Sequence, residues 1–505
     1  MSSIKIEKNP GVFDLLLGIR ARCGGATQTP GLDDNIVHDF LANDSALAIA
    51  IEEAAKAFEQ LRSELPDFIA LTEAQQIEEL LQGFTNFYAD DAITPFVPLA
   101  ARGPWLITTK GAVIHDNGGY GMLGFGHAPP SVLAAISKPH VMANIMTPNL
   151  MMGRFIKAMN KELGHRHSKG NPFKRFLCLN SGSESVTLAA RIADVNSKIM
   201  TDAGGRYEGR EICILSIGGA FHGRTDRPAR FSDSSLKVYK QHLASFREHR
   251  LLTVPPNDIE ALEDVFAQAN RDKVFIEAFF VEPVMGEGNP GMAITREFYD
   301  RARTLTKMHG SMLLVDSIQA GLRAQGCLSI IDYPGFEDCD PPDMETYSKA
   351  LNAGQYPLSV LALTEEAAAL YRKGIYGNTM TTNPRCLDAA CEAMALLTDD
   401  LRENIRARGA ELRDKLKDLG RELDDAMFKV QGTGLLVSGE LDPGKYKAYG
   451  ANSTEEYIRK RGVNVIHGGK NALRFTPYFG ITSREIDLLV AAVKDALING
   501  PVITD

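Results

Sequence analysis

The sequence of 505 residues contains no run of about 18 apolar residues, the length needed to span a bilayer. Its seven cysteines are odd in number, scattered and without a CxxC pair, so neither a disulfide framework nor a zinc site is indicated. The net charge of -9 leaves no basic surface for nucleic acid or anionic membranes. The first residues, Met1–Glu7, lack the apolar core of a secretory signal. We therefore expect a reduced, cytoplasmic protein that binds neither nucleic acid nor membrane.

The sequence pattern changes twice along the chain, which predicts three regions. Apolar residues recur at helical spacing in residues 1–100, so we expect a helical amino-terminal segment there. Short apolar strands alternate with helical stretches over residues 101–395, which predicts a large α/β domain. A charged helix, a glycine-rich strand region and a final helix occupy residues 396–505 and predict a smaller α+β domain.

Two helical stripes and a hairpin are predicted near the amino terminus. The first stripe runs over Leu47–Leu61, after the candidate N-cap Asp44. The second runs over Ile77–Tyr88, after a capping box at Thr72–Gln75. The pattern then changes, and Trp105–Asp116 predicts a β-hairpin. We interpret both stripes as packing surfaces rather than as parts of a ligand site.

Five short apolar segments within the central region are predicted to be strands. Their alternation with helical stretches is typical of a mostly parallel α/β sheet. The predicted strands are Phe176–Leu179, Glu211–Ser216, Val274–Val281, Ser311–Val315 and Leu358–Leu363.

Lys349 is the residue that packing alone explains least. It lies between Ser348 and Ala350 and precedes the apolar run Leu358–Leu363. Burial there would disfavour the ammonium form and make the amine a usable nucleophile. Asp316 ends an apolar strand, and open α/β sheets bind ligands at that end. A lysine and an aspartate so placed are the pair that a pyridoxal-phosphate enzyme needs most, although each alone is more often structural.

A glycine turn follows the first predicted strand and opens the helical stretch Val186–Ala193. Gly182 lets the backbone approach a ligand closely, and Ser183 adds a hydroxyl. Because a helix amino terminus offers free N–H groups, this turn is a candidate phosphate site. A plain strand–helix turn with a serine cap would give the same sequence.

Phe221 and His222 follow the second predicted strand. An aromatic ring there can lie on a planar cofactor ring, but a core phenylalanine beside a loop histidine has the same pattern. We expect no metal site at His222, because no second ligand occurs at a suitable spacing. His165 and His167 are expected to lie in a solvated loop.

Glu287 and Arg474 are candidate substrate-binding residues. Glu287 lies in a glycine-bearing loop after the third predicted strand, and Arg474 is an isolated arginine between apolar residues. An arginine fork matches a carboxylate bidentately, so Arg474 fits an amino acid or an oxoacid. An internal ion pair is the other interpretation, and the two are compatible.

The order of these motifs resembles that of the class III aminotransferases, a fold-type I pyridoxal-phosphate group that includes ornithine, acetylornithine and 4-aminobutyrate aminotransferases. The similarity runs from about Gly103 to Pro477. It implies a large α/β domain with a mostly parallel central sheet and helices on both faces, plus a smaller α+β domain. The matching motifs are Gly124–Pro129, Ser181–Glu184, Phe221–Thr225, Glu282-Pro283 with Gly286–Gly288, Asp316 with Gln319, and Ser348–Ala350.

The resemblance also implies a pyridoxal 5'-phosphate cofactor, a homodimer or dimer of dimers, and a role for each matching residue. Lys349 would hold the cofactor as a Schiff base and later move the proton, and Asp316 would keep the pyridine nitrogen protonated. Glu287 and Arg474 look like the pair that alternately masks and frees the 2-oxoglutarate site in ornithine-type enzymes. The other cofactor contacts would come from Gly182 and Ser183 at the phosphate, Phe221, His222 and Ile318 at the ring, Gln319 at the phenolic oxygen, and Thr379 of a neighbouring subunit.

The sequence departs from the family pattern directly after Asp316. The family usually has a glutamate there, and Ser317 is expected to remove a charge near the cofactor. The segment before residue 100 is also longer than in smaller members of the family.

We therefore expect a transaminase that moves an amino group from an amino acid or ω-amine donor to 2-oxoglutarate by a ping-pong mechanism. An amino-acid racemase or aminomutase on the same scaffold shares every cofactor residue and is the alternative. Glu287 with Arg474 favours the transaminase, because such a pair serves two alternating substrates. A lysine retained at position 349 argues against a non-catalytic scaffold protein.

Overall fold

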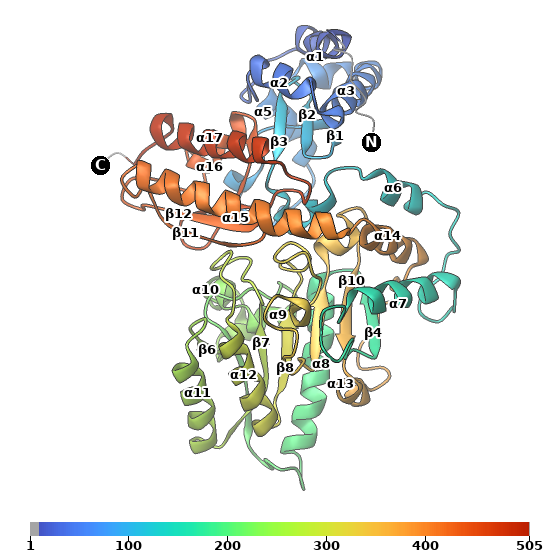
Figure 1. Ribbon diagram of the computed structural model, residues 1–505, viewed down its shortest axis with the longest axis vertical. Coiled ribbons are helices and arrows are strands. Elements are labelled where there is room, and N and C mark those ends of the chain that lie inside the picture. Colours follow the sequence, from blue (N-terminus) through green and yellow to red (C-terminus); the bar gives the residue numbers. More distant parts are fainter. Residues whose placement is uncertain (1–9, 504–505) are drawn as a thin grey trace.

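The computed structural model describes residues 10–503, and its largest sheet has seven strands in the order β4-β10-β9-β8-β7-β5-β6 (Figure 1). Strand β10 runs antiparallel to both of its neighbours, and the other six strands run in one direction. The strands are β4 (Arg175–Leu179), β5 (Glu211–Ile217), β6 (Leu252–Val254), β7 (Val274–Val281), β8 (Met312–Asp316), β9 (Met344–Tyr347) and β10 (Ser359–Leu363).

Helices cover both faces of this sheet, because successive side chains of a strand point to opposite faces. Phe280 of β7 packs with α8 (Gly182–Thr201), whereas its neighbour Phe279 packs with α12 (Arg296–His309). The predicted α/β architecture, a mostly parallel sheet with helices on both faces, is confirmed. The other helices of this part are α6 (Pro130–Ile136), α7 (Leu150–Glu162), α9 (Asp226–Phe231), α10 (Asp233–His242), α11 (Ile259–Arg271), α13 (Glu365–Leu370) and α14 (Pro384–Ala395).

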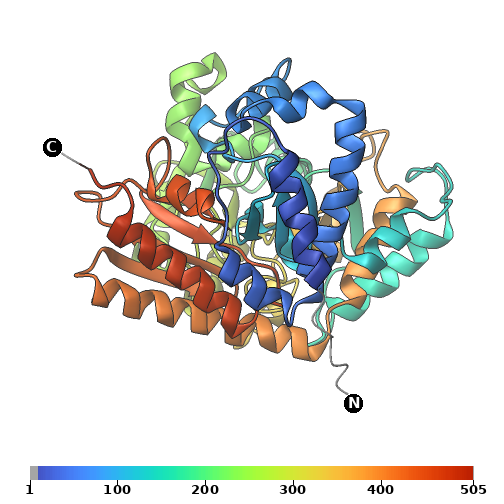
Figure 2. The same cartoon turned by 90° about the horizontal axis from the view of Figure 1, so that it is seen from above.

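A second sheet, formed by the chain after α14, has four antiparallel strands in the order β11-β12-β15-β14. Helix α15 (Asp399–Glu422) packs on β11 and β12, and α17 (Ser483–Asn499) lies beside α15, as the orange and red helices of Figure 2 show. This sheet carries Arg474 on β15. Its strands are β11 (Met427–Thr433), β12 (Leu436–Leu441), β14 (Ile466–Gly468) and β15 (Ala472–Phe475), and α16 (Thr454–Lys460) precedes β14.

A third sheet joins distant parts of the chain. It contains β1 (Pro98–Arg102), β2 (Trp105–Thr108) and β3 (Val113–Asp116), and the short β13 (Val463–Asn464) pairs in parallel with β3. The hairpin predicted at Trp105–Asp116 is therefore confirmed. The amino-terminal helices packed around this sheet are α1 (Pro10–Arg22), α2 (Asp34–Leu41), α3 (Ser45–Glu64), α4 (Pro66–Ala70) and α5 (Glu73–Leu81).

The first predicted stripe forms α3, but the second ends early. Asp44 caps α3 by accepting a hydrogen bond from the Ala46 N–H, and the capping box of Thr72 and Gln75 begins α5. Helix α5 stops at Leu81, and Gly83 follows with a φ of 87°. The prediction of a helix up to Tyr88 is thus wrong, because a glycine with a left-handed backbone conformation ends the helix.

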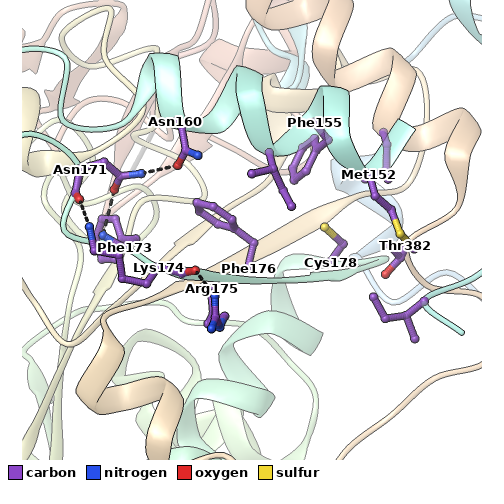
Figure 3. A pocket seen from close by; sticks show the side chains of 13 residues that line it. Met152, Phe155, Asn160, Asn171, Phe173, Lys174, Arg175, Phe176, Cys178 and Thr382 are labelled. Carbon is purple, nitrogen blue, oxygen red and sulfur yellow. Dashed lines mark hydrogen bonds between the residues drawn. The ribbon is translucent and has the colours of Figure 1, made fainter. Parts of the chain in front are cut away.

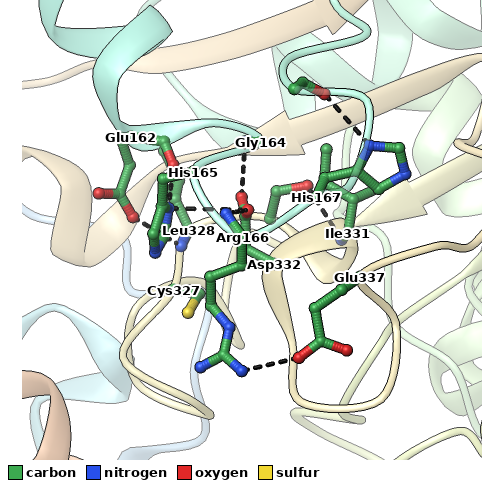
Figure 4. Close-up of polar contacts among 12 residues, drawn as sticks. Glu162, Gly164, His165, Arg166, His167, Cys327, Leu328, Ile331, Asp332 and Glu337 are labelled. Atoms are coloured by element: carbon green, nitrogen blue, oxygen red, sulfur yellow. Dashed lines mark hydrogen bonds and ion pairs between the residues drawn. The ribbon is translucent and has the colours of Figure 1, made fainter.

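The prediction of a solvated loop at His165 and His167 is wrong for His167. His167 is buried, and its Nε2 lies 2.9 Å from the carbonyl oxygen of Cys339. The loop is held inward because Asp332 accepts hydrogen bonds from the Gly164 and Arg166 N–H groups, each at 2.8 Å (Figure 4). A short polar sequence gave no sign of the buried carboxylate that these N–H groups meet.

All seven cysteines are free thiols, and burial raises the pKa of Cys327 and Cys386 to about 12. Thiols held in the protonated form are poor nucleophiles and poor metal ligands. Within residues 10–503, no helix is long and apolar enough to cross a membrane.

Candidate active site

The candidate residues gather at the carboxyl ends of four neighbouring parallel strands. Phe221 and His222 follow β5, Glu282 follows β7, Asp316 ends β8, and Lys349 follows β9. Parallel strands end at one edge of a sheet, so residues far apart in sequence meet there.

Lys349 begins the 3-10 helix η6 (Lys349–Asn352) with a φ of 50°. A side-chain-bearing residue in this left-handed region is uncommon, and such strain is found often at functional sites. Its Nζ lies 3.2 Å from Gln319 Oε1. Burial, together with the nearby charge of Arg474, lowers the pKa of Lys349 to about 8. The amine form is therefore far more available near neutral pH than in an exposed lysine.

Asp316 is a buried carboxylate held from three sides. Its Oδ2 lies 2.8 Å from His222 Nδ1, and its Oδ1 accepts hydrogen bonds from Thr346 Oγ1 and from the Ile318 N–H, each at 3.2 Å. The other ring nitrogen of His222 lies 3.3 Å from Ser216 Oγ. These contacts fix the orientation of the carboxylate at the sheet edge.

A second carboxyl group lies beside Ser317. Glu345 of β9 accepts hydrogen bonds from Ser317 Oγ at 2.6 Å and from the Ile330 N–H at 3.0 Å. Burial raises the pKa of Glu345 to about 7. The expectation that Ser317 removes a charge near the cofactor stays a prediction, and the structure adds that a buried, titratable carboxyl on the neighbouring strand lies against the Ser317 hydroxyl. The register of β8 and β9 decides this pairing, and no local motif indicates it.

Helix α8 begins at the predicted phosphate turn. The Ser181 hydroxyl accepts from the Glu184 N–H, which caps the first turn. Within residues 10–503, no acceptor takes the N–H groups of Gly182 and Ser183. A Cβ on Gly223 would lie 2.2 Å from Ser183 Oγ, so only glycine allows the neighbouring loop to approach this hydroxyl. The helix end thus presents two free N–H groups and a hydroxyl, a suitable site for an anion.

Ile318 and Phe221 approach the site from different strand ends. A Cβ on Gly182 would lie 2.7 Å from Ile318 Cδ1, so the side chain of Ile318 packs directly over the start of α8. Phe221 is half-buried, and its N–H donates to Glu282 Oε1 at 3.0 Å. Glu282 also accepts from the Gly286 N–H at 2.8 Å, and burial raises its pKa to about 7. Glu282 therefore ties two active-site loops together, a role that sequence reasoning did not assign to it.

The predicted pair Glu287 and Arg474 meets beside Gln319. Arg474 Nη1 lies 3.2 Å from Glu287 Oε2 and also donates to the Gly286 carbonyl oxygen. Gln319 Nε2 donates to the same carbonyl at 3.4 Å, and a Cβ on Gly286 would lie only 2.2 Å from Gln319 Oε1. Arg474 is 1% exposed, and its Nε has no partner among the described residues. The Nε–H group of Arg474 can thus donate a hydrogen bond to a ligand.

Sequence reasoning missed Tyr120 and Arg224. The ring of Tyr120 lies 5.7 Å from Arg474 Cζ, and burial raises the pKa of its hydroxyl. Arg224 is exposed, and its Cζ lies 4.9 Å from the ring centroid of Phe221. No carboxylate within residues 10–503 pairs with Arg224. Arg224 lies within the motif Phe221–Thr225 and Tyr120 lies shortly before the motif Gly124–Pro129, but the orientation of both side chains depends on the fold.

Thr379 lies on the surface of the chain. Its carbonyl oxygen accepts a hydrogen bond from Asn144 Nδ2 at 2.9 Å, and the neighbouring Asn378 Nδ2 donates to Glu184 Oε1 at 2.8 Å. The turn that carries Thr379 therefore lies near the start of α8 of the same chain, with its side chain exposed.

This fold and this arrangement of lysine, aspartate and helix terminus define a fold-type I pyridoxal-phosphate enzyme. The chain belongs to the class III aminotransferases, whose family profile matches residues 88–497. It is therefore a pyridoxal-phosphate-dependent aminotransferase.

Several known proteins are similar to this chain. The acetylornithine aminotransferase of Neisseria meningitidis serogroup A is 29% identical over 391 residues, which cover 76% of this chain and 90% of the relative. Ornithine aminotransferase 2 of Staphylococcus aureus is 27% identical over 434 residues, or 84% of this chain and 99% of the relative. The crystal structure of ornithine aminotransferase from Toxoplasma gondii ME49 superposes with a TM-score of 0.71 at 23% identity, covering 85% of this chain and 95% of that one.

The residues present fit pyridoxal phosphate. The free N–H groups at Gly182 and Ser183 suit its phosphate, and the buried carboxylate of Asp316 suits a protonated pyridine nitrogen. Lys349 offers an amine with a pKa near neutrality. One chain thus offers N–H groups for the phosphate, a carboxylate for the ring nitrogen and an amine.

Proposed function

We propose that this aminotransferase moves an amino group from an amino acid or ω-amine donor to 2-oxoglutarate in two alternating half-reactions. The contact between Arg474 and Glu287 carries this proposal. A buried arginine that already has an internal carboxylate partner can exchange it for a substrate carboxylate. A donor without a carboxylate at that position leaves the internal pair intact, so one site serves two differently charged substrates.

Arg224 supports a dicarboxylate as the acceptor. Arg474 Cζ lies 5.7 Å from the ring of Tyr120 and Arg224 Cζ lies 4.9 Å from the ring of Phe221, and Arg474 Nε has no partner among the described residues. Arginine binds carboxylates through a planar fork, so two such groups suit a substrate with a carboxylate at each end. The second carboxylate of 2-oxoglutarate would bind Arg224.

We assign the cofactor contacts as the sequence predicted them. Lys349 would hold the cofactor covalently and then carry the proton at the substrate carbon, for which a pKa of about 8 is suitable. Asp316, oriented by His222, would hold the ring proton. Pyridoxal phosphate, when bound, supplies the electron sink for the negative charge that develops on the substrate. The other contacts would be Gly182 and Ser183 at the phosphate, Phe221 and Ile318 at the ring faces, and Gln319 at the phenolic oxygen.

We infer a homodimer, or a dimer of dimers, from an exposed apolar face near Thr379. This face comprises Val141, Met142, Ile145, Met146, Leu150 and Met380, and Met142 is 98% exposed. It continues into a hollow of about 550 Å³ between α7 and β4, lined by Met152, Phe155, Phe176, Cys178 and Thr382 (Figure 3). Contiguous apolar surface of this kind is rare on monomers. A second copy seated here would place Thr379 at the interface, where it could complete a phosphate site.

We also infer a cytoplasmic location, which the seven free cysteines support because oxidising compartments favour disulfides.

Arg474→Lys tests the proposal for the two substrates. An ammonium cannot supply a planar two-point contact, so 2-oxoglutarate should bind roughly ten- to a hundredfold more weakly, the loss of a charged hydrogen bond worth about 1.5–3 kcal/mol. The amine half-reaction should change much less. Stopped-flow measurement of each half-reaction separates the two effects.

Glu287→Gln is the matched variant, because it removes the internal partner and leaves Arg474 in place. It should improve glutamate as a donor relative to an ω-amine. Equal weakening of both half-reactions by Arg474→Lys would contradict the proposed exchange of partners.

A further inference from the structure

Two aromatic residues of the segment after α5 lie at the active-site mouth. The chain leaves α5 at Leu81, and the rings of Phe87 and Tyr88 then lie 4.4 Å apart. Tyr88 stacks on Tyr120 with a centroid distance of 5.6 Å and an angle of 27°. Phe87 and Tyr88, expected from sequence to lie on a helix, therefore form part of the site entrance.

Phe87 and Tyr88 enclose the guanidinium of Arg224. Its Cζ lies 5.5 Å from the ring centroid of Phe87, 5.4 Å from that of Tyr88 and 4.9 Å from that of Phe221. We call these three rings the aromatic cage. A cation over an aromatic face is attracted to the ring, but its N–H groups remain unbonded. The cage thus restrains Arg224 without neutralising it.

Restraint of the Arg224 side chain before binding lowers the entropy that binding costs. An arginine side chain carries about 2 kcal/mol of rotamer entropy, and a free arginine must give up much of it when it binds a ligand. A residue that is already held in place binds more tightly for the same contact. Arg224 is an exposed residue with no carboxylate partner in the described part of the chain, so the cage is the main restraint on its guanidinium.

The cage also links the two arginines of the site. Tyr88 contacts Arg224 on one side and Tyr120 on the other, and Tyr120 in turn lies 5.7 Å from Arg474 Cζ. The position of Tyr88 therefore sets where Arg224 lies relative to Arg474. This separation decides which length of dicarboxylate can reach both groups.

We propose that Tyr88 and Phe87 are positioning residues that hold Arg224 for the distal carboxylate of the acceptor, so that this pair determines selectivity for dicarboxylic over monocarboxylic oxoacids. This inference rests on the proposed function, since it assumes that the acceptor carries a second carboxylate. It gives the amino-terminal segment a part in substrate selection.

Tyr88→Ala is the test variant, and Phe84→Ala is its matched control. Phe84 lies in the same segment and is 79% exposed, but it makes no ring contact with Arg224. Tyr88→Ala should raise the KM for 2-oxoglutarate about three- to tenfold, the range expected for one lost cation–π contact and its restraint. The KM for pyruvate should change less than twofold. Tyr88→Phe keeps the ring and should restore most of the affinity.

Ligand affinity is a second measurement, and it does not require turnover. Isothermal titration of the holoenzyme with glutarate, an inert five-carbon dicarboxylate, and with butyrate, its monocarboxylate counterpart, measures the contact directly. The cage predicts that Tyr88→Ala weakens glutarate three- to tenfold and leaves butyrate unchanged.

The outcomes separate the inference from the proposed function. A wild-type enzyme that does not use 2-oxoglutarate refutes the function, yet its glutarate affinity and the loss in Tyr88→Ala still report on the cage. Equal weakening of both acceptors, a fall in kcat without a rise in KM, an equal effect of Phe84→Ala, or no glutarate binding by the wild type would each overturn the inference.

Discussion

Lys349→Ala is expected to reduce multiple-turnover activity by at least about a thousandfold. Lys349 lies at the carboxyl end of β9 among the other site residues, and burial lowers its pKa to about 8. Its removal takes away both roles proposed for Lys349, the covalent attachment of the cofactor and the transfer of the proton, and proton transfer alone is worth about 10²–10⁴-fold. Steady-state kinetics with saturating cofactor measures the loss. Lys373→Ala, at an exposed lysine, should retain wild-type activity.

The fold should survive this change, because alanine accepts the strained φ of 50° no worse than lysine does. Circular dichroism and the melting temperature provide the control. Borohydride reduction of the wild-type holoenzyme should attach the cofactor to the peptide that contains Lys349. Labelling of a different lysine would refute the assignment.

Asp316→Asn is expected to lower kcat by two orders of magnitude or more while the cofactor stays bound. Asparagine keeps the shape and the contact with Thr346, but without a negative charge it no longer holds the proton on the pyridine nitrogen. A hundredfold loss corresponds to about 2.7 kcal/mol of transition-state stabilisation. Asp67→Asn, the same substitution at an exposed aspartate, is the matched control. Near-wild-type turnover of Asp316→Asn would show that another group pairs with the nitrogen.

The strands of the large sheet were predictable where they are long and apolar. Val274–Val281 matches β7 to the residue. The predicted segments at β4, β5 and β10 differ from the strands by one residue at one end, and the segment at β8 differs by one residue at each end. Strand β9 was missed because its four residues include Glu345 and Thr346, and the period-2 pattern needs more residues than that. β6 has only three residues and gives no pattern.

The candidate residues that belong to a sequence motif were predictable. Residues that reach the site only through the fold were less predictable. Lys349, Asp316 and Gly182 lie at element ends that sequence reasoning can locate. Glu345 reaches Ser317 only through the register of two adjacent strands. Tyr88 reaches Arg224 only because α5 stops at Leu81. The division into residues 1–100, 101–395 and 396–505 stays a prediction.

In the proposed reaction, one site carries an amino group between two substrates that are never bound together. Holoenzyme should be incubated with a ¹⁵N-labelled amine donor such as ornithine, freed of donor by gel filtration, and only then mixed with 2-oxoglutarate. About one ¹⁵N-labelled glutamate per active site is expected, with no donor present in the second step. Glutamate that forms only when donor and acceptor are mixed together, or no labelled glutamate with any donor that reacts in the first step, would contradict the proposed reaction.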